Sequence, residues 1–187
     1  MDEPDMSDID WTKMFTPGMC PSDVIGKEDL EASKLSGEWY MHRSSEFLLG
    51  MTTPTCHHAS MKISDDGSFV AMEEATFMGK TFVAENIKGL FTKNVVRADF
   101  FDEKLSVKVQ VLDTDYDNFM IGYECWDNMK FALDNDIEPV HIIKLAILTH
   151  KPDEDKEFIS SLEDKVVEKL PFWKKENFAV IKQGTEG

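Results

Sequence analysis

The stretch VQVLDTDYDNFMIGYEC, residues 109–125, decides the fold, because it has the pattern of two strands joined by a tight acidic turn. Val107, Val109 and Val111 alternate with polar residues, and this period of two predicts a strand with one apolar face. The turn at residues 114–118 is rich in side chains that close turns by bonding to nearby backbone. The segment after the turn is rich in β-formers and short for a helix. A β-hairpin is therefore predicted here.

Segments of the same kind extend on both sides of this hairpin. They are short and are separated by turn signals such as the Ser64–Gly67 run. Eight short strands with turn signals between them predict an all-β fold, a closed antiparallel barrel. Besides the two hairpin strands, of which the second covers 119–126, the expected strands cover 39–47, 56–63, 68–78, 82–90, 95–101 and 140–149.

The period changes after the last expected strand. Phe158, Leu162, Val166 and Leu170 recur at helical spacing, which predicts an amphipathic helix over about 153–170. The acidic residues that open it suit the positive end of a helix dipole, and a proline ends it.

Two segments flank this plan. Residues 172–181 form a short apolar tail, expected to be one more strand or a strap. Residues 1–35 are acidic and show no periodicity, so they are expected to form an N-terminal tail before one domain that covers 36–187.

Composition excludes several classes of function. The formal net charge of −16 argues against a nucleic-acid-binding surface, which needs clustered Lys and Arg. No apolar run approaches the length of a membrane span. The acidic N-terminus is unlike a signal peptide, so the chain is either cytosolic or a secreted protein whose signal has been removed. No metal site is expected, because Cys56 and His58 share one face of a strand while His57 points the other way.

Two short motifs resemble those of the lipocalin family. Gly37-x-Trp39 stands near the start and Thr114-Asp115-Tyr116 about two thirds along, and the resemblance covers residues 20–170. It is closest to the invertebrate bilin-binding, apolipoprotein D-like and crustacyanin-like branch. It implies an up-and-down barrel with the helix packed outside, Trp39 at the closed base and residues 48–54 as a lid over the mouth. The motif residues expected to be structural are Gly37, Trp39, Thr114, Asp115 and Tyr116.

The cysteines also follow the family in part. Cys20 and Cys125 match the pair that joins the N-terminal tail to the seventh strand in that branch, so a disulfide is implied. Cys56 matches one member of a second pair whose partner is missing here, and it is either buried and inert, paired with another chain, or reactive. The family's arginine that stacks across Trp39 is also missing, so His150 or Lys151 must substitute for it.

The resemblance, with strand alternation, assigns the faces of the barrel. An outward Cys125 puts Met120, Gly122, Glu124 and Trp126 inside, and family alignment puts Lys144 inside on the next strand. Glu124 and Lys144 either form an internal ion pair, or one of them meets the polar end of a ligand. The residues expected to line the ligand site are Met41, Phe47, His57, Met72, Ala98, Phe100, Val107, Val109, Met120, Glu124, Trp126 and Lys144.

The resemblance implies a secreted carrier, not an enzyme, that binds a small hydrophobic ligand in the barrel. The first candidates are pigments: biliverdin, whose propionates Lys144 could meet, or a carotenoid. The alternatives are a fatty-acid, lipid or haem carrier, or a lipocalin that acts by binding other proteins. No nucleic-acid partner and no membrane span are expected, and an oligomer is left open.

Overall fold

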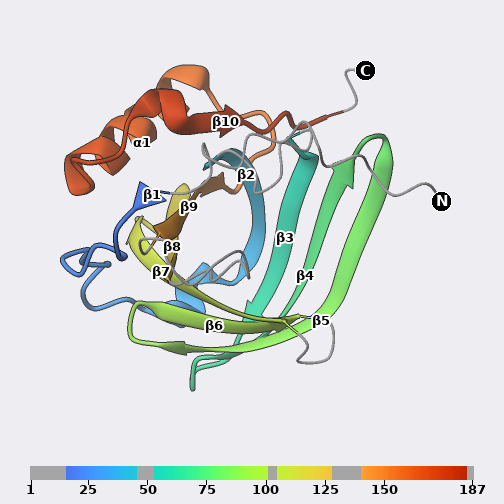
Figure 1. Cartoon of the computed structure of the whole chain (residues 1–187). Coiled ribbons are helices and arrows are strands. Elements are labelled where there is room, and N and C mark those ends of the chain that lie inside the picture. The colour runs from blue at the N-terminus through green and yellow to red at the C-terminus, as the bar shows by residue number, and fades with distance from the viewer. Residues whose placement is uncertain (1–15, 46–52, 101–104, 128–139, 185–187) are drawn as a thin grey trace, which may run out of the picture.

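Eight strands form a closed antiparallel barrel (Figure 1). The computed structural model describes residues 16–45, 53–100, 105–127 and 140–184, with the side chains of residues 100, 105–107, 127 and 140 outside the description. Each strand pairs with the next along the chain, and β9 pairs with β2 to close the barrel, as predicted. The strands are β2 (Gly37–Ser45), β3 (Thr55–Ile63), β4 (Ser68–Phe77), β5 (Lys80–Thr92), β6 (Val95–Phe100), β7 (Leu105–Thr114), β8 (Phe119–Asp127) and β9 (Val140–Thr149).

Two short strands extend the sheet outside the barrel. The N-terminal β1 (Thr16–Pro17) pairs with β9, and the C-terminal β10 (Phe178–Val180) pairs with β2. The apolar tail expected after the helix therefore does form one more strand. The described part of the N-terminal tail is anchored by β1 and by the 3₁₀ helix η2 (Ala32–Leu35); a second 3₁₀ turn, η3 (Lys175–Asn177), precedes β10.

The helix α1 (Lys156–Lys169) lies outside the barrel (Figure 1). It begins three residues later than predicted, because Asp155 is its N-cap. The Asp155 carboxylate accepts hydrogen bonds from the backbone amides of Glu157 at 2.8 Å and Phe158 at 3.0 Å. The acidic residues before Asp155 lie in the turn that leads to the helix.

The buried face of α1 packs on the outer faces of β8 and β9. Leu162 and Val166 are fully buried there as predicted, whereas Ile159 takes the buried place expected for Phe158, which is only half-buried. An ion pair between Arg43 of β2 and Glu163 adds a polar link between barrel and helix. The barrel residues in this cluster are Leu112, Phe119, Ile121, Tyr123, Leu145 and Ile147.

The closed end of the barrel is built around Trp39. Trp39 is fully buried, and its indole Nε1 donates a hydrogen bond to the carbonyl oxygen of Leu35 at 2.8 Å. Because Leu35 belongs to η2, this bond ties the 3₁₀ helix to the first barrel strand. A second apolar cluster surrounds the pair, and it includes Ile63, Phe69, Ala71, Ile87, Phe91, Ala98, Val111 and Leu148.

The two family motifs and His150 meet at this end. The Thr114 hydroxyl donates to the Phe119 carbonyl at 2.6 Å, which closes the turn between β7 and β8. The His150 ring lies 3.7 Å from the Trp39 ring, centroid to centroid, so His150 takes the place of the missing arginine. Gly37 has φ of +138°, and a Cβ there would lie 3.4 Å from the His150 ring. That contact has an ordinary length, so the positive φ, rather than a lack of space, is what favours glycine at position 37.

Asp115 holds the same turn through its carboxylate. The carboxylate accepts hydrogen bonds from the backbone amides of Asn118 at 2.8 Å and Phe119 at 3.0 Å. Burial raises the pKa of Asp115, but these bonds and one from the Asn118 side chain outweigh burial, and the pKa lies below its ordinary value. Asp115 therefore stays ionised at neutral pH and keeps the hydrogen bonds that close the hairpin.

Replacing His150 by Ala is expected to lower the free energy of unfolding by about 1–2 kcal/mol. The His150 Nδ1 atom lies 2.6 Å from the Glu38 carbonyl oxygen and Nε2 lies 3.0 Å from that of Tyr116, so the ring links β2 to the turn after β7. His150→Arg is the matched control, since a guanidinium can donate to both oxygens and stack on Trp39. Urea unfolding measures both variants, and an Ala variant as stable as the parent would contradict this role.

His42 is expected to make stability depend on pH. It is buried, and its Nε2 lies 2.9 Å from the Lys151 carbonyl oxygen. Burial lowers the pKa of His42 below its ordinary value of 6.5. Below that pH the unfolded chain therefore binds a proton at His42 more readily than the folded protein does. The stabilisation from neutral His42 is complete above about pH 6.5 and is lost as the pH falls through the pKa that His42 has in the folded protein.

The measurement is urea unfolding of the parent and of His42→Gln between pH 7.5 and about 5. The parent should lose more stability than the variant on acidification, because the variant has no histidine at this position. Curves that run parallel across this range would show that His42 does not cause the dependence.

Part of the sequence prediction lies outside the described residues. The expected lid at 48–54 is described only for its last two residues, and Phe47 is not described. Among the helices of the described part, none combines the length and the apolar character needed to cross a membrane.

Candidate ligand-binding cavity

The barrel encloses a cavity of about 540 Å³. This volume lies within the range that small-molecule sites occupy in proteins. Its wall on β5, β6 and β7 is entirely apolar among the described residues. That wall includes Phe82, Ala84 and Phe91 of β5, Val96 of β6, and Val109 and Val111 of β7.

The other side of the cavity carries four ionisable side chains, which we call the polar arc: Glu124 of β8, Lys144 of β9, His57 of β3 and Glu73 of β4. These strands follow one another around the barrel as β8, β9, β2, β3 and β4. The strand between the two halves, β2, contributes Met41 and Ser44 to the lining. The cavity therefore has one apolar side and one side with paired charges.

Glu124 and Lys144 form the first pair of the polar arc. They are directly opposite in the β8–β9 register, and Lys144 Nζ lies 3.4 Å from Glu124 Oε2. Glu124 is only 6% exposed. Burial raises the pKa of Glu124, the charge of Glu73 raises it further, and Lys144 opposes both. Lys144 Nζ also lies 5.1 Å from the centroid of the Trp126 ring, within reach of a cation–π contact.

His57 and Glu73 form the second pair. His57 Nε2 and Glu73 Oε1 are hydrogen-bonded across β3 and β4. His57 is 9% exposed, and its Nδ1 is buried with no hydrogen-bond partner among the described residues. A ligand atom in the cavity is one way to satisfy such a group.

The structure brings half of the predicted ligand-site residues to the cavity wall: Met41, His57, Val109, Met120, Glu124 and Lys144. Ala98 is instead buried in the apolar cluster around Trp39, and Trp126 lies beside the cavity through its contact with Lys144. Phe47 and the side chains of Phe100 and Val107 lie outside the described residues.

Met72 is placed on the other face of its strand, contrary to the prediction. On β4, Phe69, Ala71 and Ala75 are buried, and Val70 of the opposite parity is 50% exposed. Met72 shares the parity of Val70. Because apolar residues occur on both faces of this strand, alternation gave no basis for choosing the inward one.

Glu73 is the functional residue that the sequence did not reveal. It faces the cavity on the same parity as Phe69, Ala71 and Ala75, next to Glu74 on the opposite parity. Two adjacent acidic residues are typical of a solvent-exposed segment, so Glu73 is not predicted to line the cavity. The signal that indicates an inward Glu73 is that the residues two positions before and after it are apolar.

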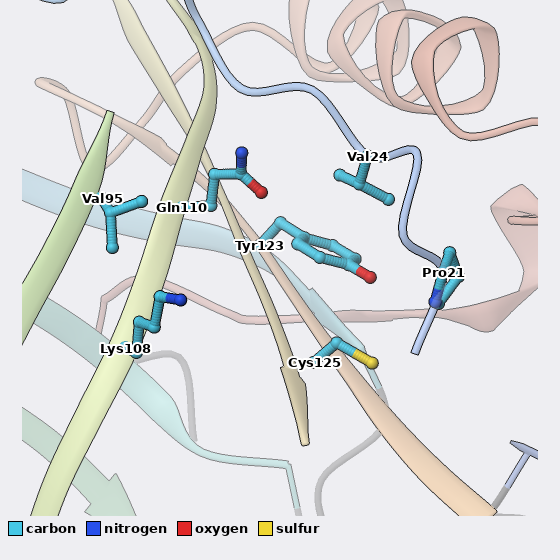
Figure 2. A pocket seen from close by; sticks show the side chains of 7 residues that line it. All are labelled: Pro21, Val24, Val95, Lys108, Gln110, Tyr123 and Cys125. Atoms are coloured by element: carbon cyan, nitrogen blue, oxygen red, sulfur yellow. The ribbon is translucent and has the colours of Figure 1, made fainter. Parts of the chain in front are cut away.

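The face of β8 opposite the cavity carries the predicted disulfide. Cys20 and Cys125 are bonded, as predicted. Figure 2 shows Tyr123 and Cys125 pointing to the same side of β8, toward the segment that carries Pro21 and Val24. These residues border a small outer pocket of about 200 Å³. The disulfide therefore fastens the N-terminal segment to the outer wall of the barrel.

Cys56 forms no disulfide among the described residues, and the side chains of His57 and His58 lie in different environments. Cys56 Sγ lies 3.6 Å from the carbonyl oxygen of Gly184, and the His58 ring lies 5.6 Å from that of Tyr40. His57 alone of the three lines the cavity. No group of three or more His, Cys, Asp or Glu side chains placed to hold a metal ion occurs in the described ranges.

Solved structures with the same architecture are lipocalins. Lobster apocrustacyanin A1 matches with a TM-score of 0.67 at 16% identity, over 92% of each chain. Insecticyanin from the tobacco hornworm Manduca sexta matches with a TM-score of 0.71 at 19% identity, over 92% of this chain and 90% of that one. A siderocalin described as functioning through dual ligand specificities matches with a TM-score of 0.53 at 13% identity, over 82% of this chain and 97% of that one. The chain therefore has the lipocalin fold.

No protein-family model and no curated protein sequence matches the chain. The likeness is thus carried by the three-dimensional arrangement rather than by sequence identity.

Proposed function

We propose that this lipocalin-fold protein is a carrier that binds a small hydrophobic ligand inside its barrel. The observation that carries the proposal is the cavity of about 540 Å³, with an apolar wall on three strands and a few polar groups opposite. Apolar walls supply affinity for a hydrophobic molecule, and a few placed polar groups orient it.

A pigment is the ligand class that the sequence resemblance favours, with biliverdin first and a carotenoid second. The methionines of the cavity, Met41, Met61 and Met120, suit a flat polarizable molecule, since thioethers pack adaptably against π systems. A bilin propionate would have to compete with Glu124 for Lys144, so a bilin would bind best with its carboxylates outside the polar arc.

Secretion belongs to the same proposal. The Cys20–Cys125 disulfide supports it, because such bonds persist in oxidising compartments and are rare in the cytosol. The formal net charge of −16 would keep a carrier soluble when it is loaded with an apolar molecule.

The test is a titration of the purified protein with biliverdin, a carotenoid, haem and a long-chain fatty acid. Trp126, which lies beside the cavity, should be quenched by a bound ligand that absorbs in the near ultraviolet, and Trp126→Phe should lose most of that signal. We expect at least one of these four compounds to bind with a dissociation constant below about 10 μM. If none binds below millimolar, the carrier function is wrong and the protein-binding alternative takes its place.

A further inference from the structure

The polar arc contains more negative than positive charge. Two carboxylates, Glu73 and Glu124, face one ammonium, Lys144, and one imidazole, His57. With both carboxylates ionised and His57 neutral, the arc carries one net negative charge. The remaining walls of the cavity on β5, β6 and β7 contribute no charge among the described residues.

Each cation of the arc already has a carboxylate partner. Lys144 Nζ lies 3.4 Å from Glu124, and His57 Nε2 is bonded to Glu73. A carboxylate on a ligand would therefore meet cations whose charge Glu124 and Glu73 already balance.

The two carboxylates of the arc line the same cavity, Glu73 from β4 and Glu124 from β8. The charge of Glu73 contributes to the raised pKa of Glu124, after burial, although they stand on β4 and β8. Their shared space is one in which a further anion is repelled and a cation is attracted. Glu73 keeps 31% of its side chain exposed and Lys144 32%, so a ligand can approach these groups.

His57 adds an unfilled acceptor to this space. A neutral His57 that donates a hydrogen bond from Nε2–H to Glu73 has a lone pair on Nδ1. This Nδ1 atom is buried without a hydrogen-bond partner among the described residues. An N–H or O–H donor on a ligand would satisfy it, whereas a carboxylate would not.

We propose that the polar end of the ligand is a protonated amine, held by the carboxylates of Glu73 and Glu124 with the hydrocarbon part against the β5–β7 wall. This inference rests on the proposed carrier function and names the ligand class for that same cavity. It replaces the contact between a ligand carboxylate and Lys144 that the sequence resemblance suggested. The group at the polar end, rather than the shape of the hydrocarbon, then decides which ligands the barrel selects.

The experiment compares decylamine, decanol and decanoate, which share one chain and differ only at the polar end. Each is titrated at pH 7 against the protein loaded with the neutral fluorescent probe N-phenyl-1-naphthylamine, in about 0.15 M salt to screen the acidic exterior. We expect decylamine to displace the probe at a concentration at least about tenfold lower than decanoate, with decanol between them.

The variants separate the arc from the overall negative charge of the protein. Glu73→Gln and Glu124→Gln should each reduce the preference for the amine over the acid to less than about threefold. Glu74→Gln is the matched control, because Glu74 is adjacent in sequence and has the outward parity of β4, and it should keep the preference of the parent. Circular dichroism confirms that each variant is folded.

The outcomes distinguish the two proposals. Decanoate binding as well as decylamine in the parent would overturn the amine assignment and leave the carrier function standing. A preference that survives in both Glu73→Gln and Glu124→Gln would show that the outer charge causes it, which also overturns the assignment. Failure of the protein to bind the probe and all three compounds would instead overturn the carrier function.

Discussion

Replacing both Cys20 and Cys125 by Ser is expected to lower the free energy of unfolding by about 4–5 kcal/mol. The disulfide spans 105 residues, and cross-linking so long a loop removes much of the conformational freedom of the unfolded chain. Natural domains have total stabilities of about 5–15 kcal/mol, so the double variant would keep about 0–11 kcal/mol, and its unfolding would shift to a lower urea concentration and a lower temperature.

The measurement is urea unfolding without reductant, for the parent and the double variant. Cys56→Ser is the matched control, since Cys56 is unbonded and only half-buried, and it should stay within about 0.5 kcal/mol of the parent. If the double variant is as stable as the parent, the Cys20–Cys125 disulfide does not stabilise the fold by restricting the unfolded chain, and this prediction is wrong.

Replacing Leu162 by Ala should lower the free energy of unfolding by about 2–5 kcal/mol. Leu162 is 0% exposed and packs in the cluster between α1 and the outer faces of β8 and β9, so the change leaves a cavity there. Because this cluster lies on the outside of the barrel wall, affinity for N-phenyl-1-naphthylamine should stay within about twofold of the parent.

Glu168→Ala on the exposed face of the same helix is the control, and it should change stability by less than about 0.5 kcal/mol. Thermal and urea unfolding measure the stability, and probe titration measures the affinity. A Leu162→Ala protein that loses probe binding while it remains folded would show that the helix is coupled to the cavity.

Sequence alternation predicted the barrel well where one face of a strand is apolar and the other polar. Along β8, Phe119, Ile121 and Tyr123 are buried under the helix while Met120 and Glu124 face the cavity, as the period of two requires. Alternation does not identify the inward face of β4, because Val70 and Met72 on one face are as apolar as Phe69 and Ala71 on the other. Choosing the inward face there needs the contacts with β3 and β5, which are set by the closed sheet rather than by the strand itself.

The polar arc could be predicted only in part. Glu124 is predicted to face inward from the outward parity of Cys125, and Lys144 from the resemblance to the lipocalin family. The pairing of His57 with Glu73 depends on the register of β3 and β4, in which Ala59 lies opposite Glu73 and His57 is two residues from Ala59 on the same face. Neither strand alone fixes this register, so the sequence does not predict the second pair.

Filling the cavity tests the carrier account most directly. Ala146 lines the cavity opposite Gly122, so Ala146→Phe would place a ring over a residue that has no side chain and would occupy ligand space. Val70→Phe on the half-exposed outer face of β4 adds the same ring outside the barrel.

The measurement is the dissociation constant of N-phenyl-1-naphthylamine for the parent and these two variants. We expect a dissociation constant below about 10 μM for the parent and for Val70→Phe, and binding at least about tenfold weaker for a folded Ala146→Phe. Equal binding by all three proteins would contradict it, because the probe would then lie outside the barrel.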